Sequence, residues 1–185
     1  MIIGICGKSG CGKSMLAKQI IELTNNRAIH LDIDKVGHRV LLLPEVKEDL
    51  VKAFGESVIN GGIVDRKKLG AIVFASPEEM AKLTDITWKY MQIEIDKFIK
   101  YYKNRIIILD WLLLPKSKYF EMCDIKILLD IPYEVRKQRA MERDGITEEA
   151  FALRDQASLN YDLSDFEYIF TDNDEENVRK LVKII

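Results

Sequence analysis

A phosphate-binding pattern that begins at the seventh residue is the strongest chemical signal in this chain. The stretch GKSGCGKS fits G-x-x-x-x-G-K-[ST], in which glycines let the backbone wrap around a phosphate with its N–H groups pointing inward. Lys13 would reach the β- and γ-phosphates of a nucleoside triphosphate, and the Ser14 hydroxyl would ligate Mg²⁺. The predicted nucleotide-binding residues are Gly7, Lys8, Ser9, Gly10, Cys11, Gly12, Lys13 and Ser14.

Two carboxylates, Asp32 and Asp34, follow an apolar run that is typical of a strand. They would lie at its carboxyl end, where open parallel sheets bind ligands, and side chains two apart on an extended chain point the same way. A carboxylate beside a γ-phosphate can accept a proton from an attacking hydroxyl, orient that hydroxyl or support a metal ion. A solvated acidic turn is the alternative.

A third carboxylate, Asp110, ends the apolar run 106–109. An acid at the end of a buried strand can help to hold Mg²⁺ or its water shell opposite the phosphate-loop serine. We therefore predict a metal site made by Ser14 and Asp110. The alternative is an aspartate that caps the turn after the strand.

Three arginines recur at helical spacing late in the chain. Arg136, Arg139 and Arg143 stand at i, i+3 and i+7, so one helix face would carry three guanidinium groups. Guanidinium groups match phosphate oxygens, and a mobile lid could bring them to the nucleotide while excluding water. The alternative is a solvated face that forms salt bridges with Glu134 and Glu142.

Two histidines and one loop cysteine are further residues whose side chains can take part in chemistry. His38 follows Asp34 by one helical turn, so contact with a substrate is plausible, whereas His30 lies within a predicted strand and is expected to be packed or hydrogen-bonded. Cys11 is interpreted as a small residue tolerated in the loop. The alternative is an oxidisable cysteine, because the predicted phosphate-binding amides around it would lower the pKa of its thiol.

The elements that must position these residues alternate between strand-like and helix-like patterns. This order predicts an α/β fold with a mainly parallel sheet, and the phosphate loop falls between the first strand and a helix over 15–23. The predicted strands cover residues 2–6, 28–31, 106–109, 125–129 and 168–170.

One helix-like stretch, from about 40 to 104, is too long for a simple crossover between parallel strands. It is broken at Asn60-Gly61-Gly62 and is predicted to form a substrate-binding cap. The arginine helix, over about 133–147, is predicted to be a lid. Both belong to a single domain that covers 1–185.

Composition limits the function classes. The 185 residues are 48% hydrophobic with a net charge of -2, so one domain can bury a core but offers no basic field for nucleic acid or an anionic membrane. No apolar run approaches the ~20 residues of a membrane span, and the first strand leaves no room for a signal peptide, so we expect a soluble cytoplasmic protein. Three cysteines without metal-ligand spacing argue against a zinc site.

With these motifs in place, the chain resembles the dephospho-coenzyme A kinase family over nearly its whole length. Residues 32–38 are similar to the family's D-x-D-x-x-x-H segment. Phe54-Gly55 and residues 60–74 are similar to its F-G…G-x-[IV]-x-R-x-x-L…F block. The lid and closing region of the family is matched by Gln138, Arg139, Arg143, Gln156 and Asn173.

This resemblance implies a P-loop NTPase fold of three layers and ATP-dependent phosphorylation, with Mg²⁺, of the ribose 3′-hydroxyl of dephospho-coenzyme A. By motif, Asp34 becomes the base or hydroxyl-orienting carboxylate, with Asp32 and His38 nearby. Arg66 would meet the substrate, and Arg139 would face the ATP phosphates. The cap becomes the coenzyme A-binding region.

The chain departs from the family pattern at two places on the expected acceptor side. Thr87-Trp88 stands where the family often has His-Pro, and residues 112–116 read LLLPK where the family usually has Pro-Leu-Leu-x-Glu. A divergent kinase for another nucleotide-like or small hydroxyl substrate is therefore an alternative, as is an ATP-binding pseudokinase. A guanine-nucleotide switch is not supported, because no N-K-x-D pattern occurs.

Overall fold

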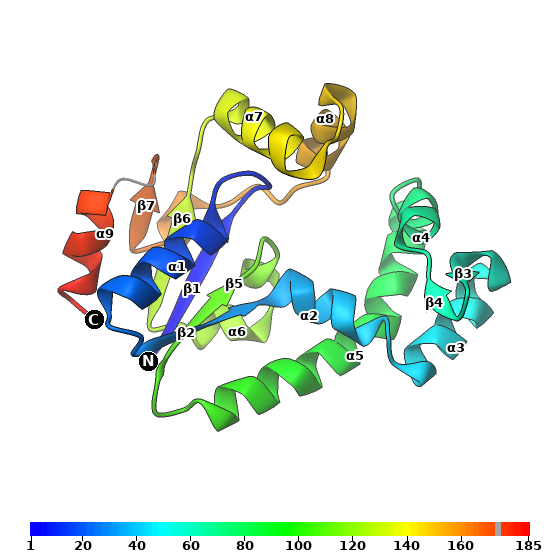
Figure 1. Ribbon diagram of the computed structural model, residues 1–185, viewed down its shortest axis with the longest axis horizontal. Coiled ribbons are helices and arrows are strands. Elements are labelled where there is room, and N and C mark those ends of the chain that lie inside the picture. The colour runs from blue at the N-terminus through cyan, green and yellow to red at the C-terminus, as the bar shows by residue number, and fades with distance from the viewer. Residues whose placement is uncertain (173–174) are drawn as a thin grey trace. The chain divides into compact units, whose positions relative to one another are not determined.

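The computed structural model describes residues 1–172 and 175–185, which form two compact units (Figure 1). The sheet unit comprises Met1–Asp32 and Tyr101–Ile185, and the helical unit comprises Ile33–Lys100. The helical unit contains most of the predicted cap, but it begins at Ile33 rather than near residue 40.

The sheet unit is built on a parallel sheet with the strand order β2-β5-β1-β6-β7. The prediction of an α/β fold with a parallel sheet is confirmed. Asp32 lies opposite Asp110 in the register of β2 and β5, so both carboxylates stand at the same edge of the sheet. The strands are β1 (Ile2–Gly7), β2 (Ala28–Asp32), β5 (Ile106–Asp110), β6 (Ile125–Leu129) and β7 (Tyr168–Phe170).

One face of this sheet is covered by α1 (Lys13–Leu23) and α9 (Glu175–Val182). Their apolar side chains pack with alternate strand residues, because successive side chains of a strand point to opposite faces. The fully buried members of this core include Ile3, Ile5 and Leu16.

On the opposite face, the chain after β5 lies directly against β1. A Cβ atom at Gly4 would lie 2.8 Å from Cys123 Sγ and 2.9 Å from Leu114 Cδ2, so this close approach requires glycine. The segment includes η2 (Leu114–Lys116) and α6 (Lys118–Glu121).

Two helices, α7 (Tyr133–Asp144) and α8 (Glu148–Gln156), lie beside the phosphate loop (Figure 1). Gly145 ends α7 with φ of 63°, a backbone conformation that glycine adopts without strain. The Thr147 side chain accepts a hydrogen bond from the Ala150 N–H and so caps the start of α8. The short helix η3 (Leu163–Asp165) precedes β7.

The helical unit has its own apolar core, which includes the buried residues Val46, Leu50 and Leu69. The predicted break at Asn60-Gly61-Gly62 is the turn of a small antiparallel hairpin. Lys47 Nζ donates a hydrogen bond to the Gly62 carbonyl in this turn at 2.8 Å. The elements of this unit are α2 (Ile33–Val40), α3 (Pro44–Phe54), η1 (Glu56–Val58), β3 (Ile59–Asn60), β4 (Ile63–Val64), α4 (Arg66–Val73) and α5 (Pro77–Tyr101).

Among the described residues, none of the helices combines the length and the apolar character needed to span a membrane.

Candidate active site

The phosphate loop runs from the end of β1 to the start of α1, in the strand, loop and helix order that the pattern predicts. Gly12 precedes α1 with φ of 95°, and no side chain caps the helix. The first N–H groups of a helix have no intrahelical acceptor, and the helix dipole favours an anion at this end. The loop therefore has the local structure that binds phosphate.

Two hydrogen bonds shape the loop from within. Lys13 Nζ donates to the Gly7 carbonyl at 3.0 Å, so the lysine side chain folds back across the loop. The Cys11 N–H donates to the Lys8 carbonyl at 3.2 Å. The ammonium group is thus held above the loop, where it can reach the phosphates of a bound nucleotide.

Cys11 faces the protein interior, which agrees with its interpretation as a small residue tolerated in the loop. Its exposed fraction is 1%, and burial raises the pKa of the thiol, although the Lys13 charge lowers it in part. A thiol with a raised pKa carries little thiolate and reacts slowly. The alternative, a thiol with a lowered pKa, is therefore wrong.

Ser14 and Asp110 are neighbours across the end of the sheet. The Ser14 hydroxyl donates to Asp110 Oδ2 at 2.8 Å, and His30 Nε2 lies 3.2 Å from the same oxygen. Asp110 is 3% exposed. The expectation that His30 is hydrogen-bonded is confirmed, and the structure brings together the two residues predicted to bind metal.

Ser14 and Asp110 suit a magnesium ion that is held mainly by nucleotide phosphates and water. Among the residues that the structure describes, no group of three or more histidines, cysteines or acids could hold a metal ion alone. Mg²⁺ in nucleotide sites commonly takes one hydroxyl or carboxylate from the protein and the rest from phosphates and water. The donors present fit that arrangement, and the metal role of Ser14 and Asp110 stays a prediction.

The acidic pair is not arranged as expected, because Asp32 and Asp34 do not share an extended segment. Asp32 is the last residue of β2, and α2 begins at Ile33, so Asp34 is an exposed acid in the first turn of a helix. The two carboxylates also belong to different units. An acid in the first turn is favourable to the helix, so its position alone does not prove a chemical role.

His38 and Arg66, both predicted to contact substrate, meet within the helical unit. Arg66 Nη2 lies 2.9 Å from His38 Nε2, so the guanidinium donates to the unprotonated imidazole nitrogen. Asp65 caps α4 through hydrogen bonds from the N–H groups of Lys67 and Lys68, and this places Arg66 at the first position of the helix. Four of the predicted site residues therefore form two pairs, Ser14 with Asp110 and His38 with Arg66.

The three arginines of α7 do not form one exposed face, which corrects the prediction. The Arg136 side chain is 7% exposed and forms an ion pair with Asp155, whereas Arg139 and Arg143 are exposed. Arg139 Nη1 lies 3.5 Å from the Cys11 carbonyl of the phosphate loop. Arg139 alone of the three combines an exposed position with contact to the loop.

Arg143 makes a different connection, at the end of α7. It donates two hydrogen bonds to the Asp144 carboxylate, which also accepts one from Arg154 of α8. These hydrogen bonds hold the pKa of Asp144 at about 2. Arg143 is therefore part of a salt-bridged surface that links α7 to α8, as the alternative reading of the arginine helix expected, though its partner is Asp144.

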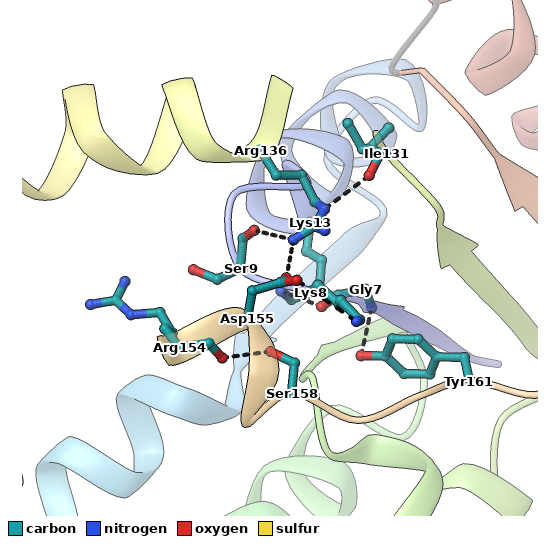
Figure 2. A network of polar contacts seen from close by, with 10 residues as sticks. All are labelled: Gly7, Lys8, Ser9, Lys13, Ile131, Arg136, Arg154, Asp155, Ser158 and Tyr161. Atoms are coloured by element: carbon teal, nitrogen blue, oxygen red, sulfur yellow. Dashed lines mark hydrogen bonds and ion pairs between the residues drawn. The ribbon is translucent and has the colours of Figure 1, made fainter. Parts of the chain in front are cut away.

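Two further residues at the loop had no signal in the sequence. The Tyr161 hydroxyl accepts a hydrogen bond from the Gly7 N–H at 3.2 Å (Figure 2). The same hydroxyl donates one to the Leu112 carbonyl at 2.9 Å. Asp155 lies between Lys8 and Arg136 (Figure 2). Both residues follow α7 in the sequence, and only the tertiary fold brings them into contact with the loop or with Arg136 beside it. Asn173, expected in the closing region, lies outside the described residues.

The two segments that depart from the family pattern both contain buried residues. Thr87 is buried in α5, where its hydroxyl donates to the Leu83 carbonyl at 2.8 Å, and the helix is continuous there. In the LLLPK segment, Leu114 is fully buried and Leu112 supplies the carbonyl that Tyr161 contacts. Each segment therefore contributes a buried residue to the structure of this chain.

Comparisons with known proteins agree with this geometry. The family model described as "Dephospho-CoA kinase" matches residues 1–176. A curated dephospho-CoA kinase of Aquifex aeolicus is 39% identical over 155 residues, covering 82% of this chain and 77% of the relative. One of Fusobacterium nucleatum is 32% identical over 157 residues, covering 80% and 76%.

Solved structures share the fold. A crystal structure from Thermus thermophilus superposes with a TM-score of 0.84 at 25% identity, covering 100% of this chain and 96% of the other. A dephospho-CoA kinase from Campylobacter jejuni gives a TM-score of 0.65 at 22% identity, covering 99% and 94%. At that identity the second likeness supports the fold alone.

Proposed function

This chain belongs to the dephospho-CoA kinase family, and we propose that it transfers the γ-phosphate of ATP to the ribose 3′-hydroxyl of dephospho-CoA. The products are coenzyme A and ADP. The observation that carries the proposal is the family match over residues 1–176, which includes an intact phosphate loop with Ser14 beside Asp110.

The phosphate loop binds the nucleotide in this proposal. Its N–H groups and the start of α1 hold the phosphates, and the ammonium group of Lys13 balances the charge of the migrating phosphoryl group. Ser14 and Asp110 would hold Mg²⁺, which neutralises charge on the β- and γ-phosphates when it is bound. Arg139 adds a guanidinium group that contacts the loop at the Cys11 carbonyl.

The helical unit recognises the acceptor. The contact between Arg66 and His38 holds a cationic group and an imidazole together on exposed positions of α4 and α2. A guanidinium suits the phosphate groups that dephospho-CoA carries. Asp34, one turn before His38 on α2, accepts or orients the proton of the 3′-hydroxyl, and Asp32 is the alternative residue for that role.

The proposed acceptor can be tested with a panel of hydroxyl compounds. We expect ATP-dependent ADP release from the purified protein to be fastest with dephospho-CoA, and the product to carry a new phosphate on its ribose 3′ position. The control is the same panel without protein. If a nucleoside, nucleotide or sugar is preferred over dephospho-CoA, the proposed acceptor is rejected. If no compound in the panel supports ADP release, a pseudokinase is favoured.

Arg139→Ala is expected to lower kcat by about 10²-fold or more with little change in melting temperature. Arg139 is exposed, so its loss removes transition-state charge stabilisation without opening the core. The matched control is Arg179→Ala, which removes an exposed arginine of α9. If Arg139→Ala keeps its kcat while its melting temperature falls, the residue has a structural role.

A further inference from the structure

We propose that Asp155 is a positioning residue for ATP binding: through a buried ion pair it fixes Arg136, and through Arg136 it holds the backbone of the phosphate loop. The inference rests on the proposed function, because it assigns a role at the proposed ATP site. Asp155 itself lies on α8, outside the phosphate-loop pattern.

The guanidinium of Arg136 connects three parts of the sheet unit. Its Nη1 lies 2.5 Å from Asp155 Oδ1 and 3.4 Å from the Ser9 carbonyl oxygen, and its Nε donates to the Ile131 carbonyl at 2.9 Å. Figure 2 shows this guanidinium between the loop, the end of β6 and α8. The Arg136 and Asp155 side chains are 7% and 16% exposed, so water screens their charges weakly.

The loop lies directly against the backbone of Arg136. Gly10 has φ of 80°, and a Cβ atom there would lie 2.3 Å from the Arg136 carbonyl oxygen. The backbones of the loop and of α7 are therefore in direct contact, and the guanidinium holds the Ser9 carbonyl from the same helix. A displacement of Arg136 would move the atoms that surround the phosphates.

The second oxygen of the Asp155 carboxylate faces a second cation, the Lys8 ammonium group of the loop. Lys8 Nζ lies 4.0 Å from Asp155 Oδ2. One carboxylate thus offsets the charges of Lys8 and Arg136, which would otherwise repel each other beside the loop. Both cations keep their positions before a triphosphate arrives, and this lowers the ordering cost of binding.

Helix stability does not explain an acid at this position. Asp155 lies in the last turn of α8, where the helix dipole disfavours a negative charge. The ion pair with Arg136 and the approach of Lys8 offset that penalty. Asp155 is thus placed for its contacts with the loop and α7.

The test measures MgATP affinity by calorimetric titration alongside the melting temperature. We expect Asp155→Asn to weaken MgATP binding by about tenfold, because the amide still accepts a hydrogen bond from Arg136 but no longer supplies the countercharge, and to lower the melting temperature. The double variant Arg136→Met with Asp155→Leu removes both charges. We expect it to regain melting temperature, since apolar residues can replace a buried ion pair, but to keep the weakened affinity.

The matched control is Glu148→Gln, which breaks the ion pair between Glu148 of α8 and Lys137 of α7. This pair links the same two helices at 2.7 Å, and the Lys137 ammonium contacts Glu134 and Glu148 rather than the loop. We expect its MgATP affinity to match that of the wild type. An equal loss of affinity in Glu148→Gln would mean that any loosening of α7 against α8 disturbs the site, and the specific role of Asp155 would be rejected.

Three results would overturn the inference. The first is wild-type MgATP affinity in Asp155→Asn despite a lower melting temperature. The second is wild-type MgATP affinity in the double variant, and this measurement alone decides the test if Asp155→Asn does not fold. The third is tighter binding in Asp155→Asn, since Asp155 would then compete with ATP for Lys8 and Arg136. A wild-type protein that binds no MgATP would instead reject the proposed function.

Discussion

Lys13→Ala is expected to lower phosphoryl transfer by about 10³-fold or more while the protein stays folded. The ammonium group of Lys13 is held over the loop by its hydrogen bond to the Gly7 carbonyl. A cation that follows the transferred phosphoryl group stabilises charge that develops in the transition state, and groups of this kind have effects of this size. The measurement is kcat with saturating dephospho-CoA and ATP.

The control for this variant is Lys18→Ala on the same helix. Lys18 is an exposed residue of α1 that pairs with Glu22, so its loss removes a positive charge from the helix without touching the loop. We expect Lys18→Ala to keep wild-type turnover and both variants to keep melting temperatures close to that of the wild type. Wild-type turnover in Lys13→Ala would mean that this loop is not the catalytic ATP site.

The phosphate loop could be predicted in detail because its information is local. The fixed glycines, the lysine and the serine lie within eight consecutive residues, and the strand before them and the helix after them follow from apolar spacing. The contact of Ser14 with Asp110 joins residues far apart in sequence, yet it was also predicted. The strands β1 and β5 are parallel neighbours, so Asp110 at the end of β5 lies near the loop that leaves the end of β1 and leads to Ser14 in α1.

The arrangement of Asp32 and Asp34 was predicted wrongly although the sequence held the signal. Ile33, Val36 and Val40 stand at i, i+3 and i+7, which is a helical period, and these are the buried residues of α2. The helix starts directly after the strand, without a loop. The spacing of the two acids predicts an extended segment, but the apolar period that overlaps it determines the structure.

The position of Arg136 could not be predicted from spacing. Arg136 is three residues before Arg139 but also four before Ala140, so helical geometry permits it to lie on either face. Burial places Arg136 with Ala140, because Asp155 supplies the countercharge that a buried guanidinium needs. That partner comes from another helix, and no local pattern relates the two residues.

The direction of the Cys11 pKa shift also depends on contacts that the local sequence does not contain. The neighbours of Cys11 in the sequence are phosphate-binding amides and Lys13, which lower a thiol pKa, and the structure retains the lysine effect. The dominant effect is burial, which raises it. Burial depends on helices and strands that pack around the loop, so the sign of the shift becomes known only with the fold.

Asp34→Asn is expected to lower turnover by about 10²–10⁴-fold, the range for a positioned acid or base. The change keeps the size of the side chain and most of its hydrogen bonding but removes the basic carboxylate. MgATP affinity should change little, because the residue is proposed to act on the acceptor hydroxyl. Steady-state kinetics with dephospho-CoA, together with calorimetric titration of MgATP, separate the two effects.

The helix itself needs a control, since an acid in a first turn also stabilises α2. Glu45→Gln is a matched change, because Glu45 is the first-turn acid of α3 in the same unit. We expect both variants to lose about 0.3–1 kcal/mol of stability at most, and Glu45→Gln to keep its turnover. Near-normal turnover in Asp34→Asn with an inactive Asp32→Asn would instead assign the proton to Asp32. Since Asp32 stands at the sheet edge opposite Asp110, the carboxylate that acts on the acceptor would then belong to the sheet unit.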